Sequence, residues 1–285
     1  MNKDVTIVFV GYYSKDKIKK YLNQFNDKFK VIIIENSYDF SLRKIIKKFK
    51  HTSIIFNKKN LGFGASSNIG LKNIKTKYGI HLDLDTNCSN KSILKLIEEA
   101  KKLNDFIILG PKIRNYNYKI EDFQKKNISK NLSSMNFIDG CCMLFNMKKL
   151  KKHGYFDENF FLYFEEYDLF KRFIRKDEKI IMTNRVSISH KGRSSTNKRY
   201  SKEIEINRNW HYLWSKFYFY RKHYNYLYAF IKISGSLLSS FLRIPIFFLV
   251  GSKFKKRIYV ARLLGILNSM INNKSWYRPN IKNIK

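Results

Sequence analysis

Short runs of β-branched and aromatic residues, separated by lysine-rich amphipathic stretches, constrain the fold of this 285-residue chain more than any other feature. The runs are VTIVFV (5–10), KVIIIEN (30–36), TSIIFN (52–57), YGIHLDLD (78–85) and DFIILGP (105–111). Between them, stretches such as KDKIKKYLNQF and SILKLIEEAKKL carry apolar residues at helical spacing. Strands that alternate with helices predict an α/β fold with a mostly parallel sheet buried on both faces.

The second half of this pattern continues after a polar segment that follows Pro111. A strand is expected over 137–145 and a helix from about 163, and a last strand, KIIMTNRVSISH, runs to His190. In such sheets ligands bind at the carboxyl ends of strands. Those ends are Gly11-Tyr12, Glu35-Asn36 and Asp83 to Asp85, so these positions are the first candidates for a site.

Asp83 and Asp85 stand at the exit of a predicted buried strand. Residues two apart on a strand point the same way, so both carboxylates can be aimed at one place. A divalent cation removes the conflict between two such close charges, and oxygen ligands beside phosphates suit Mg²⁺ or Mn²⁺. Taken alone, the pair with Thr86 and Asn87 is more often simple turn chemistry.

The chain is strongly basic, with a net charge of +35. Such a charge attracts nucleic acid or an anionic membrane. Abundant Lys, Asn, Ile, Phe and Tyr with only 3 Pro and 12 Gly also fit the drift of an A+T-rich genome. All but two of the acidic residues, Glu203 and Glu205, precede His190, so the two parts of the chain are expected to have different roles.

Cysteine usage and the N-terminus bear on the compartment. Cys88, Cys141 and Cys142 cannot form a disulfide framework and lack zinc spacing, which is typical of a reducing cytoplasm. The apolar run before Gly11 is too short for the core of a signal peptide. We therefore expect a cytoplasmic protein.

Three motifs follow one another in the chain: KKNLGFGASSNIGLKNIKTKYGIHLDLDT, then FIDGCCMLFNMKKLKKHGYFDENFFLYFEEYDLFKRF, then SHKGRSS. Together they resemble the inverting glycosyltransferases of family 2, which have the GT-A fold, and within them the rhamnosyltransferase-like branch of bacterial surface-polysaccharide synthesis. The resemblance covers about residues 4–195. It implies a Rossmann-like catalytic domain over 1–200, with a nucleotide-sugar half (about 1–110) and an acceptor half (about 111–200), followed by a basic, aromatic-rich helical extension over 201–285.

The resemblance also implies roles for individual residues. Donor-binding positions fall on Val10, Gly11, Tyr12, Glu35, Asn36, Gly62, Asn68, Asp83, Lys191 and Arg193. The metal ligands fall on Asp85, Asp83 and His190, and the acidic catalytic motif, EEYD, supplies Glu166 with Glu165 and Asp168. Two departures are GYYS after the first strand, where the family has an Asn-x-Ser-like turn, and Glu166 in place of the usual aspartate.

Helical spacing in FFLYFEEYDLFKRF gives independent support for Glu166. It shares a face with Leu169, Phe170 and Phe173, so we expect it to point into a covered cleft, where desolvation raises the pKa of a base. Glu165 is turned about 100° away, and Asp168 is expected to form a surface or supporting ion pair with Arg172. The alternative for Glu165 and Glu166 is helix N-terminal charge favoured by the macrodipole.

Two smaller features also allow more than one interpretation. His190 beside KGRSS is by default a surface histidine. The GASS stretch is as typical of a helix cap as of a phosphate site.

The stretch 210–270 mixes aromatic, basic and apolar residues. Its longest charge-free run, 233–242, is far shorter than the roughly 20 residues of a spanning helix. We expect interfacial amphipathic helices, with Lys253, Lys255, Lys256 and Arg257 against an anionic leaflet. The alternative is a helical hairpin that packs on the catalytic domain.

These observations predict a glycosyltransferase peripherally associated with the inner face of the cell membrane. It would use a divalent cation, Mg²⁺ or Mn²⁺, to transfer a sugar from a dTDP-rhamnose-like or UDP-sugar donor to a hydroxyl of a growing, lipid-linked glycan, with inversion. One alternative is a nucleotidyltransferase, but GYYSKD lacks the Gly-rich basic loop that such an enzyme needs. The other is a nucleic-acid-binding protein, but no known motif for that function is present and no nucleic-acid partner is expected.

Overall fold

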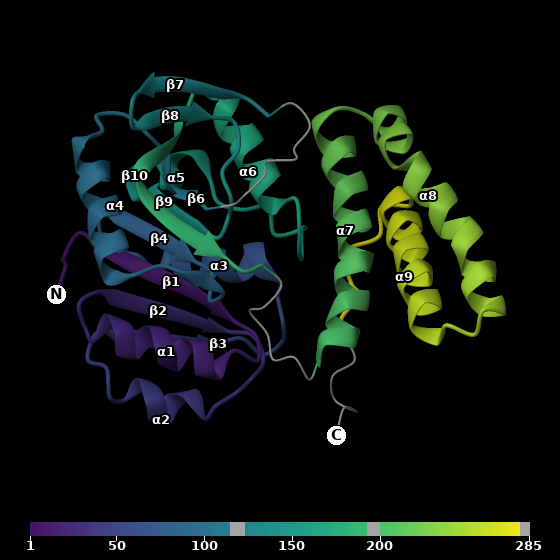
Figure 1. Cartoon of the computed structure of the whole chain (residues 1–285), viewed down its shortest axis with the longest axis horizontal. Helices are drawn as coiled ribbons and strands as arrows, with labels where there is room; N and C mark the ends of the chain where they lie inside the picture. Colours follow the sequence, from purple (N-terminus) through teal and green to yellow (C-terminus); the bar gives the residue numbers. More distant parts are fainter. Residues whose placement is uncertain (115–122, 193–199, 280–285) are drawn as a thin grey trace. The chain divides into compact units, whose positions relative to one another are not determined.

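The computed structural model describes residues 1–114, 123–192 and 200–279. The chain divides into two compact units (Figure 1). The first comprises Met1–Leu61, Ala65–Phe156 and Leu169–Thr196, and the second comprises Gly62–Gly64, Asp157–Asp168 and Asn197–Lys285. The chain therefore enters the second unit three times.

The first unit is built on a mixed sheet. Its strands are β1 (Val5–Gly11), β2 (Lys30–Glu35), β3 (Thr52–Phe56), β4 (Tyr78–Leu82), β5 (Thr86–Asn87), β6 (Ile108–Ile113), β7 (Lys125–Ser129), β8 (Leu132–Met135), β9 (Cys142–Asn146) and β10 (Ile180–His190). They lie in the order β3-β2-β1-β4-β9-β6-β10-β8-β7, and β5 pairs with β10. The predicted α/β fold with a mostly parallel sheet is confirmed, and β1 to β4 are all parallel.

The sheet contains both parallel and antiparallel strand pairs. β1 is parallel to β2 and β4, β2 is parallel to β3, and β6 is parallel to β10. β9 is antiparallel to both neighbours, β4 and β6. Sequence analysis did not predict the hairpin of β7 and β8, because the polar, fully exposed KKNIS of β7 carries no apolar alternation.

Helices cover the sheet: α1 (Lys15–Phe25), α2 (Leu42–Ile46), α3 (Phe63–Lys72), α4 (Asn90–Lys102) and α5 (Met147–His153). The strongly amphipathic α1 buries Tyr21 and Phe25 on Phe9 of β1, at ring distances of 5.1 and 5.9 Å. The Ser89 side chain caps α4 by accepting a hydrogen bond from Ser92 N–H. α6 (Glu165–Ile174) begins in the second unit and ends in the first.

The second unit contains the helices α7 (Ser201–His223), α8 (Tyr226–Leu249) and α9 (Lys253–Met270), which pack on one another (Figure 1). Trp210 and Phe217 of α7 are fully buried. α9 approaches α7 so closely at Gly265 that an added Cβ would lie 2.3 Å from Trp210 O. Glycine is needed there for this helix contact.

α8 runs continuously through Lys232 and Arg243, the two charges that interrupt its apolar sequence. Among the described residues it is the one helix that is, by length and composition, long and apolar enough to cross a membrane, and it is mostly exposed. A helix of this length and composition was not expected from the sequence, where only charge-free residues were counted. Lys232 and Arg243 interrupt the apolar run but not the helix, which continues over 24 residues.

Candidate active site

The turn after β4 holds the two aspartates. Because β4 ends at Leu82, Asp83 and Asp85 follow the strand and do not lie on it. The expectation that alternation along a strand points both carboxylates the same way is therefore wrong for this pair. Instead, Asp83 N–H donates to Cys141 O at 2.8 Å and Thr86 N–H donates to Asp83 O at 3.2 Å. These backbone hydrogen bonds fix the turn at the carboxyl end of β4.

A short ladder brings His190 to this turn. β5 pairs with the end of β10, with His190 opposite Thr86. His190 Nε2 lies 3.2 Å from Asp85 Oδ1 and 3.9 Å from Asp83 Oδ2. One ligand atom from each of these three side chains lies within 4.8 Å of the other two. The fold thus joins Asp85 and His190, which are 105 positions apart in the sequence.

Electrostatics in this cluster favour a positive charge. His190 Nδ1 lies 3.5 Å from Asp139 Oδ1. Burial lowers the pKa of His190, but hydrogen bonds to Asp139 and Asp85 raise it to about 10. Burial likewise raises the pKa of Asp139, yet hydrogen bonds from His190 and Cys141 hold it below its usual value. A proton or a metal ion can therefore neutralise these carboxylates, and the two compete.

Two overlapping groups in the described part of the chain have metal-site distances: Asp83, Asp85 and His190, and Asp139, Cys141 and His190. A cysteine ligand must be a thiolate, and burial raises the pKa of the Cys141 thiol well above its usual value. The group with both aspartates fits better. Two carboxylates suit Mg²⁺ or Mn²⁺, and the imidazole favours a transition metal over Mg²⁺.

Three residues around this cluster were not predicted from the sequence: Asp139, His81 and Lys17. His81 is fully buried, and its Nε2 lies 3.1 Å from Asp83 Oδ1. Burial lowers the pKa of Lys17 on α1, while the charge of Asp85 raises it, so this amine is within electrostatic range of the site. His81 had a signal, because it lies two positions before Asp83. Asp139 and Lys17 have no pattern that marks them in one sequence.

The ends of β1 and β2 form a second part of the site, where Gly11 and Glu35 are register partners. Glu35 Oε1 accepts hydrogen bonds from the Ser37 N–H, at 2.6 Å, and from the Ser37 hydroxyl. Burial nevertheless raises the pKa of the Glu35 carboxyl. Its Oε2 is buried without a hydrogen-bond partner among the described residues, 2.8 Å from where a Gly11 Cβ would lie. This oxygen suits a hydrogen-bond donor of a bound nucleoside.

Other residues predicted to bind the nucleotide-sugar donor lie near the ends of β1 and β2. Val10 and Tyr12 are half-buried on either side of Gly11. Asn36 is buried and donates from Nδ2 to Ser66 Oγ at 2.8 Å. Asn57 Nδ2 donates to Asn36 Oδ1, also at 2.8 Å, so the Asn36 amide joins the end of β2 to α3.

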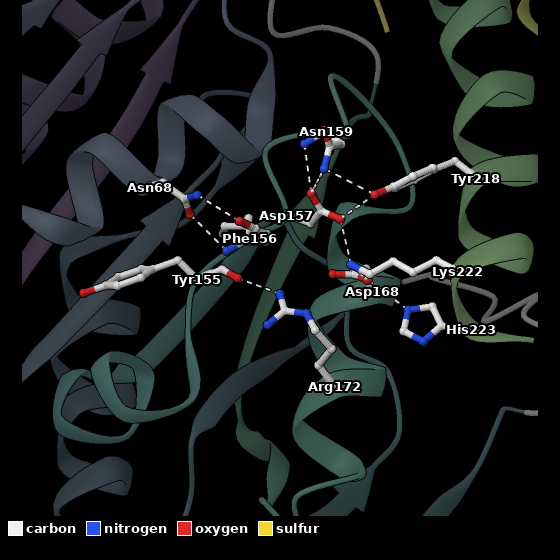
Figure 2. Close-up of polar contacts among 10 residues, drawn as sticks. All are labelled: Asn68, Tyr155, Phe156, Asp157, Asn159, Asp168, Arg172, Tyr218, Lys222 and His223. Carbon is white, nitrogen blue, oxygen red and sulfur yellow. Dashed lines mark hydrogen bonds and ion pairs between the residues drawn. The ribbon is translucent and has the colours of Figure 1, made fainter. Parts of the chain in front are cut away.

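Gly62 and Asn68 have structural contacts of their own. Gly62 has a φ of +87°, and an added Cβ would lie 2.1 Å from Phe161 O. Asn68 Oδ1 accepts a hydrogen bond from Phe156 N–H at 3.0 Å, and its Nδ2 donates to Phe156 O at 2.9 Å (Figure 2). Both side-chain atoms of Asn68 therefore fix the backbone just before Asp157.

Of the two basic residues predicted after β10, the structure describes Lys191. Lys191 is exposed, and its N–H donates to Asp85 O at 3.2 Å. Arg193 lies outside the described residues.

The first turn of α6 differs from the expectation. Glu165 is buried, Glu166 is half-buried and Asp168 is fully buried. The prediction that Glu166 is the more enclosed glutamate is wrong, because both faces of this turn are covered and a single apolar stripe does not describe it. Asp168 is not on the surface, and its described partners are Lys222 and His223.

The backbone before α6 is unusual. Tyr163 and Phe164 have φ values of 68° and 67°, directly before Glu165. Left-handed residues other than glycine cost about 1–3 kcal/mol each and persist where surrounding contacts hold them, often at functional sites.

Comparison with known proteins relates this chain to glycosyltransferases. Residues 15–154, which include β2 to β9, match Glycosyl transferase family 2. This match covers just under half of the chain. The chain is also 22% identical over 201 residues to the low-salt glycan biosynthesis hexosyltransferase Agl10 of Haloferax volcanii. That match covers 62% of this chain, and the chain spans 64% of the length of this relative.

Solved structures show the same fold at low sequence identity. The mannosyltransferase PcManGT from Pyrobaculum calidifontis, in complex with GDP-Man and Mn²⁺, has a TM-score of 0.57 at 10% identity, with 95% of this chain and 88% of that chain covered. GalNAc-T7 with UDP, GalNAc and Mn²⁺ has a TM-score of 0.55 at 13% identity, with 76% and 49% covered. The predicted GT-A fold is confirmed.

Proposed function

We propose that the chain is a glycosyltransferase that transfers a sugar from a nucleotide-diphosphate donor to a hydroxyl of a glycan acceptor, with inversion. The observation that carries this proposal is the cluster of Asp83, Asp85 and His190 at the carboxyl end of β4, whose two aspartates lie in the stretch that matches Glycosyl transferase family 2. The complexes of PcManGT and GalNAc-T7 with nucleotide, sugar and Mn²⁺ support it. The rhamnosyltransferase-like branch and a lipid-linked acceptor remain part of the proposal.

The metal ion would be held by Asp85, Asp83 and His190 and would supply positive charge to the leaving diphosphate. Lys17 and Lys191 add positive charge near Asp85. Glu35 Oε2 offers a buried acceptor to the nucleoside. Together these residues orient the donor so that its anomeric carbon faces the acceptor hydroxyl.

Glu166 is the proposed general base. The acceptor oxygen forms a bond to the anomeric carbon, the bond from that carbon to the diphosphate breaks, and Glu166 takes the hydroxyl proton. The half-buried Glu166 is able to reach a bound acceptor, whereas Glu165 is buried. Partial exposure, not the apolar stripe, now favours Glu166 as the base.

The donor half of this proposal is tested by thermal shift with Mn²⁺ and a panel of nucleotides and nucleotide sugars. A bound donor raises the melting temperature by mass action. We expect a Mn²⁺-dependent rise with one nucleotide class that disappears in Asp85→Asn and persists in Asp16→Asn, because Asp16 is exposed on α1. A rise that survives both Asp85→Asn and a chelator contradicts the metal assignment.

The catalytic half is tested with the stabilising donor and an acceptor library. Glu166→Gln should lower kcat by roughly 10²- to 10⁴-fold with donor stabilisation nearly unchanged, the usual effect of losing a positioned base. Glu166→Asp should recover part of the rate. If Glu165→Gln is the inactive variant and Glu166→Gln retains most activity, the base is assigned to the wrong residue.

We further propose that the tip formed by α8 and α9 binds the inner face of an anionic membrane. Exposed apolar side chains gather at the end of α8: Phe241, Leu242, Ile246, Phe248, Leu249 and Val250. Basic residues flank them, and Lys255 and Lys256 lie 5.3 and 5.0 Å from the rings of Phe247 and Phe248. An apolar surface bordered by lysine is typical of an interfacial helix pair.

Sedimentation with liposomes tests the membrane proposal. The double variant Phe248→Asp, Leu249→Asp should lose binding to anionic vesicles by tenfold or more, because insertion of each large side chain contributes about 1.5–3 kcal/mol. Leu94→Asp, an exposed leucine on α4, is the matched control. Binding of the intact chain should weaken as salt rises. Absence of vesicle binding by the intact chain would exclude the proposal.

A further inference from the structure

The segment from Asp157 to Asp168 carries both candidate catalytic glutamates and contacts α7 at each end. Lys222 Nζ lies 2.7 Å from Asp157 Oδ2 and also pairs with Asp168 Oδ1. His223 Nε2 lies 2.9 Å from the same Asp168 oxygen. The Tyr218 hydroxyl donates to Asp157 Oδ2 at 3.1 Å. Figure 2 shows that these side chains converge between α7 and the segment, with one lysine bound to both of its ends.

The middle of the Asp157–Asp168 segment also contacts α7. Phe160 packs in the apolar cluster that α7, α8 and α9 form. The ring of Phe161 stacks on His211 at 4.3 Å, and the Ser215 hydroxyl donates to Leu162 O at 2.9 Å. The contacting residues of α7 follow helical spacing: His211, Ser215, Tyr218 and Lys222. They form one face of α7, so the helix supports the segment along its length.

The carboxylates of Asp157 and Asp168 repel each other unless a cation lies between them. Burial and the charge of Asp168 raise the pKa of Asp157, and the hydrogen bond from Lys222 brings it below its usual value. Asp168 is fully buried, so its carboxylate also needs a charged partner. Without Lys222 the two carboxylates repel and the two ends of the segment separate.

The left-handed backbone at Tyr163 and Phe164 makes the position of Glu165 depend on these contacts. Such a conformation relaxes when its surroundings no longer hold it. The turn that presents Glu166 therefore has little rigidity of its own and takes it from α7.

We propose that Lys222, with His223, is a positioning residue for sugar transfer: it joins Asp157 to Asp168 and thereby holds Glu166 in its reactive place. Asp168 acts in this arrangement as an anchor and does not touch substrate. This inference rests on the proposed function. It assigns the basic helical extension a part in the chemistry, in addition to any membrane contact.

The test compares Lys222→Met, Lys222→Arg and the control Lys202→Met, since Lys202 is exposed on the same helix. Hydrogen exchange of the free protein is measured first. We expect faster amide exchange over 158–167 in Lys222→Met, near wild-type exchange in Lys222→Arg and no change in Lys202→Met. If Lys222→Met does not fold, Lys222→Gln, which removes the charge but keeps a hydrogen-bond donor, takes its place with the same expected exchange.

Kinetics then separate positioning from simple loss of stability. Lys222→Met should lower kcat by at least tenfold with the donor KM and the Mn²⁺-dependent donor stabilisation unchanged, because small displacements of a catalytic group are costly. Lys222→Arg should restore most of kcat. Unchanged exchange over 158–167, or equal losses in kcat and donor binding, overturns the inference. A wild-type chain that transfers no sugar and binds no donor, with the exchange result as expected, overturns only the proposed function.

Discussion

His211 of α7 gives the second unit a measurable dependence on pH. The ring is fully buried, with Nε2 2.8 Å from Tyr277 O and Nδ1 2.9 Å from Ser275 Oγ. Burial lowers the pKa of His211 to about 3, with a further lowering by the charge of Arg278. The unfolded chain binds this proton with a pKa of 6.5. Between these values the unfolded state holds more protons, so the free energy of unfolding falls as the pH falls through 6.5.

The size of the effect follows from that linkage. From pH 7.5 to 5.5 the contribution of His211 falls by about 1.4 kcal/mol, and it is lost entirely near pH 3. His190 works in the opposite sense, because its folded pKa is raised to about 10 and its contribution is full at low pH. The wild-type curve alone therefore hides both effects, and the comparison with His211→Gln isolates one.

Denaturant unfolding followed by tryptophan fluorescence measures this difference. All 3 tryptophans of the chain, Trp210, Trp214 and Trp276, belong to the second unit. His211→Gln should be less stable than wild type at pH 7.5, and this deficit should shrink by about 1.4 kcal/mol at pH 5.5. A deficit that stays constant to within about 0.3 kcal/mol between the two pH values would refute the reasoning.

Three further predictions concern stability. Lys222 holds the pKa of Asp157 below its usual value, so stability present above about pH 4 is lost as the pH falls further; Asp157→Asn should flatten this acid limb in circular dichroism melts. Gly265→Ala should destabilise by about 1–3 kcal/mol in denaturant titrations, because the new methyl group meets Trp210 O. Gly235→Ala in α8 meets no atom of another described element within 4 Å and should stabilise by about 0.5–1 kcal/mol in the same titration.

Local pattern predicted the first strands well. The runs at 5–10, 30–36 and 52–57 became β1, β2 and β3. β1 and β2 are almost entirely buried, and a strand buried on both faces needs a continuous apolar run. β9 begins at Cys142, later than the strand expected over 137–145, because the preceding residues form a turn that binds Asp83.

The site was less predictable because long-range pairing assembles it. Asp139 reaches His190 only because β9 and β10 belong to the same sheet, and nothing in FIDGCC marks the aspartate for that role. Periodicity also failed at Glu165 and Glu166, since it assumes that one side of a helix faces water. The start of α6 is enclosed on more than one side, so the less buried glutamate is the better candidate for contact with an acceptor.

The repeated passage of the chain between its two units limits how the enzyme can be shortened. Cutting after the last strand, at about residue 200, would remove α7 yet leave Asp157–Asp168 behind, without the helix against which it folds. A truncated chain of this kind keeps the full sheet and the aspartate turn, so it would still look folded and could still take up a nucleotide. Its failure to transfer sugar would then be blamed on a missing membrane anchor. Point substitutions on the exposed tip of α8 avoid that confusion, because they leave the support of the glutamate-bearing segment in place.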